Sequence, residues 1–274
     1  MQKQPVIVIT GCSTGIGLET ALYLKERFVT VYPTVRTQED SERLRSLGFE
    51  QVLQLDVRKP EQISAVIDTV LDREGQIDVW FNNAGYGQVG AIEDIRTEVL
   101  KKQFETNVFG VHECTWQILP VMRAQGFGKI IQHSSVLGIT SLFGRGAYNA
   151  SKYAVEGLTD TLRLELQDTE IYPILLNTGP VTSRFRETAV KMLQRHVDID
   201  HSLFRERYRG SIEGTAKKVP FNEEPEAVAS VVHRIILADK PQPRYYITKA
   251  TYLLGTAKRV LSTAWLDRLL LRLG

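Results

Sequence analysis

Short apolar runs alternate with longer amphipathic segments along most of the chain. The short runs are rich in β-branched residues and have the length of strands that are buried on both faces. The longer segments repeat apolar residues at helical spacing. We expect strands at 5–10, 29–35, 51–55, 78–82, 129–134, 171–176 and 244–248, and helices at 15–27, 39–47, 60–73, 97–124, 147–167 and 224–238. This alternation predicts an α/β fold, a doubly wound parallel sheet of about seven strands with helices on both faces.

The regular alternation stops after residue 183. Residues 184–225 are rich in Arg, Glu and His, and we expect them to form an insertion that covers the substrate as a lid. Residues 250–272 predict an amphipathic helical extension, with apolar residues at helical spacing beside several cations. That extension could pack over the pocket, pack against a partner subunit, or make a weak peripheral membrane contact. We expect residues 1–274 to form a single domain.

Composition narrows the class of protein. The chain has 274 residues, 43% of them hydrophobic and 24% charged, and a formal net charge of +2, which gives no general case for nucleic-acid binding. Cys12 and Cys114 are too far apart in sequence for a disulfide framework or for metal-ligand spacing, so we expect no metal site. The N-terminal residues lack the features of a signal peptide, and a cytoplasmic location is the expectation.

A glycine-rich turn follows the first expected strand, with the sequence TGCSTGIG at residues 10–17. Such a turn lets backbone N–H groups approach a phosphate, and the N-terminus of the following helix adds a favourable dipole. Arg36 closes the second expected strand, where an acid would favour NAD. An arginine there favours NADP(H) over NAD(H), because it can pair with the 2′-phosphate. The alternative is an arginine that only faces solvent.

A phenol and an ammonium group lie one helical turn apart, at Tyr148 and Lys152. Taken alone, this spacing is common on helix surfaces. A free phenol has a pKa near 10, and a neighbouring ammonium group stabilises the phenolate and lowers that pKa. The pair could therefore act as an acid and base, provided that other motifs support the same chemistry.

Five motifs together resemble the short-chain dehydrogenase/reductase family, which has a Rossmann-type fold. They are Thr10–Gly17 (TGCSTGIG), Asn82–Gly85 (NNAG), Asn107 in ETNVFG, Ser135 in QHSSVLG, and Tyr148–Lys152 (YNASK). They occur in the family's order and at its spacing, and the resemblance is firm over residues 5–183. At finer grain the chain is similar to a bacterial branch, the YbbO-type NADP-dependent aldehyde reductases, near retinol and 17β-hydroxysteroid dehydrogenases.

The resemblance implies roles for individual residues. Tyr148 would be the acid, Lys152 would tune it, Ser135 would hold the substrate oxygen, and Asn107 would support a water linked to Lys152. The cofactor-binding set implied is Gly11, Ser13, Thr14, Gly15, Ile16, Gly17, Arg36, Asp56, Val57, Asn83, Ala84, Gly85, Tyr148, Lys152, Gly179, Pro180, Val181, Thr182 and Ser183. Thr178 stands where the family usually has Pro, and Ser183 where it usually has Thr.

The expected substrate side is largely apolar. Its expected residues are Ser135, Leu137, Leu142, Tyr148 and Phe185. Such a lining favours a small hydrophobic aldehyde or ketone, so the leading hypothesis is an NADP(H)-dependent reduction of a carbonyl to an alcohol. A retinol- or hydroxysteroid-type alcohol dehydrogenase and a non-catalytic dinucleotide-binding regulator are the alternatives. In this family the helices expected at 97–124 and 147–167 often form subunit interfaces, so we expect a homodimer or homotetramer.

Overall fold

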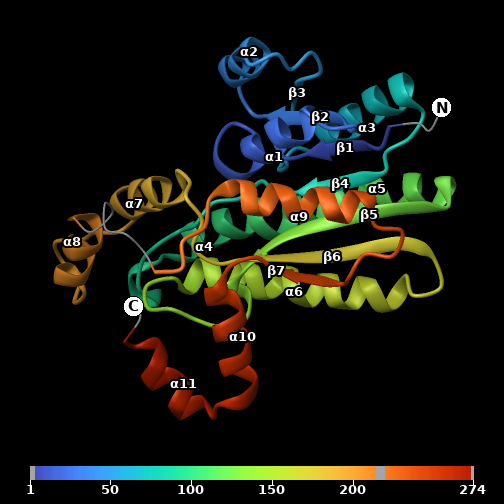
Figure 1. The fold of residues 1–274 in the computed structure, drawn as a ribbon. Helices are drawn as coiled ribbons and strands as arrows, with labels where there is room; N and C mark the ends of the chain where they lie inside the picture. Colours follow the sequence, from blue (N-terminus) through green and yellow to red (C-terminus); the bar gives the residue numbers. More distant parts are fainter. Residues whose placement is uncertain (1–3, 214–219, 273–274) are drawn as a thin grey trace.

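Seven parallel strands form one sheet in the computed structural model, which describes residues 4–213 and 220–272 (Figure 1). The strand order is β3-β2-β1-β4-β5-β6-β7, so the chain reverses its direction of winding between β1 and β4. The strands are β1 (Val6–Ile9), β2 (Thr30–Val35), β3 (Leu53–Gln54), β4 (Val79–Asn82), β5 (Phe127–Ser135), β6 (Glu170–Thr178) and β7 (Arg244–Tyr246). The predicted α/β class and doubly wound sheet are confirmed. Ligands of such sheets bind at the carboxyl ends of the strands, near the reversal.

Helices cover both faces of the sheet, and others lie beyond it (Figure 1). The α-helices of the described residues are α1 (Gly15–Lys25), α2 (Gln38–Ser46), α3 (Pro60–Glu74), α4 (Thr97–Phe104), α5 (Gly110–Gln125), α6 (Gly146–Glu165), α7 (Phe185–His196), α8 (Arg205–Glu213), α9 (Pro225–Leu237), α10 (Lys249–Val260) and α11 (Thr263–Leu270). Ile7 and Ile9 of β1 pack into one core cluster, whereas Val6 and Val8 pack into another. Burying each of these side chains contributes roughly 1.5–3 kcal/mol, which explains why the strands read as continuous apolar runs.

The helix expected at 97–124 is interrupted at its centre. The segment α4 ends at Phe104, a π-helical turn η2 covers Glu105–Phe109, and α5 begins at Gly110. Single π turns inside helices are frequent at functional sites. Here the turn carries Asn107, whose side chain bonds a neighbouring loop instead of facing solvent.

The segment expected as a lid, residues 184–225, contains the two short helices α7 and α8 joined by turns. Apolar side chains of α7 and α8 pack with Val89 and Ala91 in a cluster of their own, and the hydroxyl of Tyr208 accepts a hydrogen bond from Ala91 N at 2.7 Å. The irregular pattern in the sequence therefore hides two short helices. Residues 214–219, which belong to the expected lid, lie outside the described residues.

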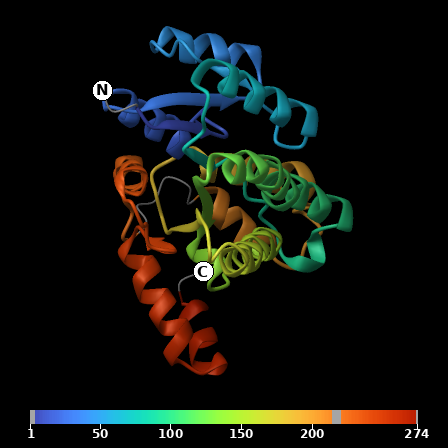
Figure 2. The same ribbon diagram turned by 90° about the vertical axis from the view of Figure 1, so that its right-hand side faces the viewer.

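The C-terminal helices α10 and α11 form a hairpin that projects from the body of the molecule (Figures 1 and 2). Leu254 of α10 packs on the cluster around Tyr148, and Leu266 and Leu270 of α11 are buried. Leu253 and Trp265 are exposed on the hairpin. In the described part of the chain, no helix is both long and apolar enough to cross a bilayer.

Candidate active site

The end of β5 and the first turns of α6 bring the expected catalytic residues together. Ser135 ends β5, where its hydroxyl accepts a hydrogen bond from Leu137 N at 3.1 Å and caps a short 3-10 turn. This turn directs the chain toward α6, which carries Tyr148 and Lys152. The Ser135 hydroxyl is close enough to Tyr148 to lower the pKa of the phenol, and Ser135, Tyr148 and Lys152 are all buried.

Burial is the largest influence on the pKa of the Tyr148 phenol. It raises the pKa of Tyr148 to about 12, against the smaller opposing effects of the Ser135 hydrogen bond and the charge of Arg145. The lowering expected from Lys152 is not seen, because loss of hydration disfavours the phenolate more than nearby groups stabilise it. The phenol is therefore protonated near neutral pH, which is the form needed to donate a proton.

Lys152 is held by the strand behind it. Its Nζ donates to the carbonyl oxygen of His133 at 2.6 Å and lies 5.7 Å from the centre of the Tyr148 ring. Burial lowers the pKa of Lys152 to about 8, and the carboxylate of Glu156 opposes that fall. The ammonium group is thus fixed in direction and close to its titration range at neutral pH.

Asn107 binds the loop that follows β4. Its Oδ1 accepts from Tyr86 N at 3.1 Å, and its Nδ2 donates to Tyr86 O at 2.9 Å and to the Ser151 hydroxyl at 3.3 Å. The π turn makes these bonds possible, because it turns the amide away from the helix axis and toward α6. Asn107 is thereby placed beside the helix of Tyr148 and Lys152.

The glycine-rich turn is packed too closely for other residues. A Cβ on Gly11, which has φ +72°, would lie 2.8 Å from the Cα of Ala84. A Cβ on Gly17 would lie 2.4 Å from Nδ2 of Asn83, the atom that donates to Thr10 O and Gly11 O. These contacts hold the loop after β4 against the glycine-rich turn. The glycines leave the backbone between β1 and α1 uncovered by side chains. Such a cradle fits the pyrophosphate of a dinucleotide.

Two arginines lie near the expected adenosine end. Arg36 is exposed at the end of β2, and its carbonyl accepts from Gln54 Nε2 at 2.8 Å. Arg43 of α2 donates to the carbonyl of Ser13 and pairs with Asp40 at 2.9 Å. Asp56 is paired with Arg58, whose hydrogen bonds hold the pKa of Asp56 below its usual range. The sequence did not predict that Arg43 would contact the glycine-rich turn, because nothing in its position on α2 indicates the bond to Ser13.

The expected cofactor residues that follow β6 do not all lie beside the glycine-rich turn. The hydroxyl of Thr182 donates to Glu224 at 2.9 Å, so it is engaged away from the cradle. Ser183 lies beside the glycine turn, since a Cβ on Gly15 would be 3.2 Å from Ser183 Cβ. Gly179 allows close packing, because a Cβ there would lie 2.1 Å from the hydroxyl of Thr248. Of the two hydroxyls considered for the cofactor, Ser183 is the better placed.

Comparisons with known proteins agree with this geometry. The family model for short chain dehydrogenase matches residues 5–194. This protein belongs to the short-chain dehydrogenase family. The uncharacterized oxidoreductase YbbO of Escherichia coli is 37% identical over 271 residues, 98% of this chain and 94% of that protein. Human 17-beta-hydroxysteroid dehydrogenase type 1 is 32% identical over 256 residues, 89% of this chain and 77% of that protein.

A solved structure supports the same assignment. That structure is an actinorhodin polyketide ketoreductase with NADPH, which has a TM-score of 0.75 and 29% identity over 93% of this chain and 98% of that chain. The chain is therefore an oxidoreductase of the short-chain dehydrogenase family, with the fold that the five motifs predicted.

The substrate side of this short-chain dehydrogenase is apolar around Tyr148. Val136, Leu137 and Tyr148 form a buried cluster with Leu142 and Leu254. The ring of Phe185 lies 5.3 Å from the ring of Tyr148. The structure thus brings the expected substrate residues Leu137, Leu142 and Phe185 together, and it adds Leu254 from the C-terminal hairpin.

The buried imidazole ring of His133, on β5, makes hydrogen bonds to residues on both neighbouring strand ends. The Nδ1–H of His133 donates to Asn83 Oδ1 at 3.0 Å, and Nε2 lies 3.1 Å from the hydroxyl of Thr178. Burial, together with the charge of Lys152, lowers the pKa of His133 to about 3. His133 is therefore neutral at any ordinary pH. Its ring connects the loop that follows β4, through Asn83, with the end of β6, through Thr178.

A second buried network lies behind Lys152. The carboxylate of Glu156 accepts from the Ser134 hydroxyl, from Asn177 Nδ2 at 2.6 Å and from Arg244. Arg244 also donates to Asn177 Oδ1 at 2.9 Å. Asn177 therefore has a structural role, because its amide bridges an acid and a base that are 88 residues apart.

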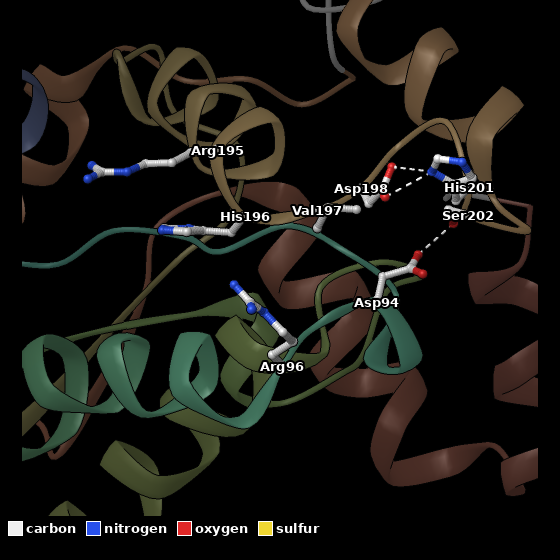
Figure 3. Close-up of a pocket in the computed structure, with 8 residues that line it drawn as sticks. All are labelled: Asp94, Arg96, Arg195, His196, Val197, Asp198, His201 and Ser202. Carbon is white, nitrogen blue, oxygen red and sulfur yellow. Dashed lines mark hydrogen bonds and ion pairs between the residues drawn. The ribbon is translucent and has the colours of Figure 1, made fainter.

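An open surface pocket of about 480 Å³ lies away from these residues, between η1 (Ile92–Asp94) and the ends of α4 and α7 (Figure 3). Its lining contains none of the expected site residues. Both of its carboxylates are engaged, Asp198 with His201 and Asp94 with Ser202. The described residues also hold no group of His, Cys, Asp and Glu that could bind a metal ion.

Proposed function

We propose that this short-chain dehydrogenase is an NADP(H)-dependent carbonyl reductase acting on a hydrophobic aldehyde or ketone. The observation that carries the proposal is that Ser135, Tyr148 and Lys152 are buried together at the end of β5 and the start of α6, with the Lys152 ammonium group 5.7 Å from the Tyr148 ring. This arrangement presents a protonated phenol and a hydroxyl to one oxygen atom. A binding protein without chemistry would have no use for a phenol held in this way.

Each side chain has a distinct task in the proposed reaction. A bound nicotinamide supplies the hydride. Tyr148 donates its phenolic proton to the carbonyl oxygen, and Ser135 holds that oxygen by a hydrogen bond. Lys152, directed by the carbonyl of His133, stabilises the phenolate that remains. After the product leaves, the Tyr148 phenolate must regain a proton, which Lys152 can pass on and itself recover from solvent; Asn107 keeps the loop at Tyr86 against α6 and can support a water on that route.

The preference for NADP(H) rests on the charge at the adenosine end. Arg36 and Arg43 can pair with a 2′-phosphate, and a guanidinium matches phosphate geometry well. Arg36 stands at the end of β2, where an acid would hold the ribose hydroxyls of NAD. The ketoreductase of similar fold is described with NADPH, which favours the same cofactor.

The apolar lining around Tyr148 supports a hydrophobic substrate. Alcohol oxidation is the second candidate, since a similar human protein is a 17-beta-hydroxysteroid dehydrogenase. The segments α7 and α8 would act as a lid over this lining. A cytoplasmic location remains part of the proposal.

Assembly into a homodimer or homotetramer is part of the proposal. Phe109 and Trp116 on η2 and α5, and Tyr153, Leu158 and Leu164 on α6, are large apolar side chains exposed in the single chain. Apolar side chains exposed on two long helices are typical of a surface that is covered in an oligomer. Sedimentation of the purified protein would measure the assembly state.

Nicotinamide absorbance during turnover tests the proposed function. The purified protein would be mixed with NADPH, or separately with NADH, and with a medium-chain aldehyde or a retinoid alcohol plus the oxidised cofactor. We expect oxidation of NADPH, far slower oxidation of NADH, and loss of both in Tyr148→Phe. Turnover of the alcohol alone would favour the second candidate, and no turnover of either would refute the enzyme proposal.

A further inference from the structure

Two arginines flank the Tyr148 phenol, and neither has a place in the reaction described above. Arg145 immediately precedes α6, three residues before Tyr148. Arg186 follows Phe185 in the first turn of α7, and the ring of Phe185 packs against Tyr148. Two cations from separate parts of the chain are therefore attached next to residues that border the phenol, and the charge of Arg186 acts on Arg145, as that of Arg145 acts on Tyr148.

The backbone at Arg145 is fixed firmly. Gly90 N donates to Gly144 O at 2.9 Å, and Arg145 forms a parallel bridge with Gly90. Arg145 N donates to Leu142 O at 3.3 Å, and its carbonyl accepts from Asn149 N at 2.8 Å. The backbone of Arg145 is therefore held in place next to the apolar lining, unlike that of an arginine on a surface loop.

The two guanidinium groups have no counter-ion among the described residues. Both side chains are partly buried, and no described carboxylate is paired with either of them. Burial and the charge of Arg186 lower the pKa of Arg145, whereas the phenol of Tyr148 opposes this fall. Burial likewise lowers the pKa of Arg186. Residues 214–219, outside the description, contain no Asp or Glu that could supply a side-chain partner.

Two like charges in a partly desolvated place destabilise the fold unless something offsets them. The other described arginines that are partly buried do have partners: Arg163 pairs with Asp160 at 2.6 Å, Arg244 pairs with Glu156, and Arg27 donates to Tyr23 O. Among the described residues, Arg145 and Arg186 are the partly buried arginines that lack such a partner. Groups arranged at such a cost are typical of binding sites.

We propose that Arg145 and Arg186 form an anion subsite, and that the substrate is a carbonyl compound with a carboxylate close to the reacting carbon. The inference rests on the proposed function, because it assigns the substrate class of the same site. Arginine binds carboxylates through two parallel N–H···O bonds, and such charge-assisted bonds are about twice as strong as neutral ones.

The position of the subsite limits the shape of the substrate. Side chains three residues apart near a helix start lie only about 5–6 Å apart at their Cβ atoms. The carboxylate must therefore follow the carbonyl by a short spacer. The rest of the molecule would lie against Leu137, Leu142 and Phe185, so the substrate is an amphiphilic oxo acid with an apolar body.

A matched pair of aldehydes tests this subsite. The probes are 3-carboxybenzaldehyde and its methyl ester, reduced with NADPH by the wild-type protein, Arg145→Met, Arg186→Met and the control Arg184→Met. We expect wild-type kcat/KM to be roughly 10- to 100-fold higher for the acid than for the ester, since a charged hydrogen-bonded pair contributes this much. The first two variants should lose most of this ratio, mainly through KM, and Arg184→Met should keep it.

A binding measurement separates the subsite from the reaction. Titration calorimetry with benzoate and benzamide on the same proteins should give wild-type binding of benzoate that Arg145→Met weakens by about tenfold or more, with benzamide bound weakly by all. Equal turnover of acid and ester, with a ratio unchanged in the variants, would overturn the subsite and leave the reductase proposal intact. Absence of turnover with retained, Arg145-dependent benzoate binding would instead overturn the reductase proposal.

Discussion

Replacing Glu156 by glutamine removes the negative charge that opposes the effect of burial on Lys152. Glu156 lies one helical turn beyond Lys152 on α6 and is 8% exposed. Glutamine has nearly the same shape, so its Oε1 can still accept from Ser134 and Asn177. The main change is therefore electrostatic, and it acts on the lysine that is expected to stabilise the Tyr148 phenolate.

The size of the effect follows from the spacing of the two residues. Side chains four apart on a helix are about 6 Å apart, and unit charges at that distance attract by about 2.8 kcal/mol at an effective dielectric constant of about 20. That energy corresponds to about two on the pKa scale. Arg244 keeps its charge in the variant, so it does not reduce this difference. We therefore expect the pKa of Lys152 to fall by about two, from about 8 toward about 6.

Because the pKa of Lys152 should fall, the effect should be visible on the alkaline side of the pH–rate profile. Lys152 must carry its proton to stabilise the phenolate, so activity should be lost on the alkaline side as the ammonium group deprotonates. In Glu156→Gln this alkaline limb of the kcat profile should move to lower pH by about two, and activity should fall far more at pH 8 than at pH 5.5, where most of the lysine stays protonated. Rates of NADPH oxidation between pH 5.5 and 10 measure the limb.

A neighbouring variant provides the control. Asp160 also contacts Arg244, at 3.4 Å, but it lies two turns from Lys152. Asp160→Asn should leave the alkaline limb in place. An unchanged limb in Glu156→Gln, with a melting temperature equal to that of the wild type, would refute the electrostatic role of Glu156.

Three further changes test other parts of the site. Arg36→Glu should raise KM for NADPH by roughly 10- to 100-fold and leave KM for NADH almost unchanged, because only NADPH carries the 2′-phosphate; equal effects on both cofactors would contradict its role. His133 has a pKa of about 3 in the folded protein and about 6.5 when unfolded, so stability should fall as pH drops from 6.5 toward 3, by at most about 5 kcal/mol. Urea unfolding at several pH values measures this slope, which should flatten in His133→Asn. Gly17→Ala should cost roughly 1–3 kcal/mol in the same measurement and weaken cofactor binding, because its Cβ would lie 2.5 Å from Gly11 O.

Local patterns were sufficient to predict the sheet and much of the site. Strands that are buried on both faces must be apolar throughout, so β1 and β4 are visible in the sequence. The glycine turn and the Tyr148–Lys152 pair are equally local, since their function depends on spacing within one turn or one helix. These features could be interpreted without knowledge of long-range contacts.

The remaining features depend on residues that the fold brings together from distant positions. Glu156, Asn177 and Arg244 come from α6, β6 and β7, and no spacing in the sequence joins them. The π turn is also invisible, because it adds one residue to a helix whose apolar pattern continues. Arg145 and Arg186 look like ordinary surface cations until the structure shows that they are partly buried and lack carboxylate partners among the described residues.

The three networks of the site meet on a single helix face. Tyr148, Lys152 and Glu156 are spaced by four residues along α6, and so form one stripe. The last three residues of β5 face that stripe: Ser135 lowers the pKa of Tyr148, the His133 carbonyl accepts from Lys152, and Ser134 donates to Glu156. The acid, the ammonium group and the carboxylate behind it are therefore positioned by one strand end. A slip of α6 against β5 would disturb all three contacts together, which explains how a short stretch of chain holds a reaction centre in register.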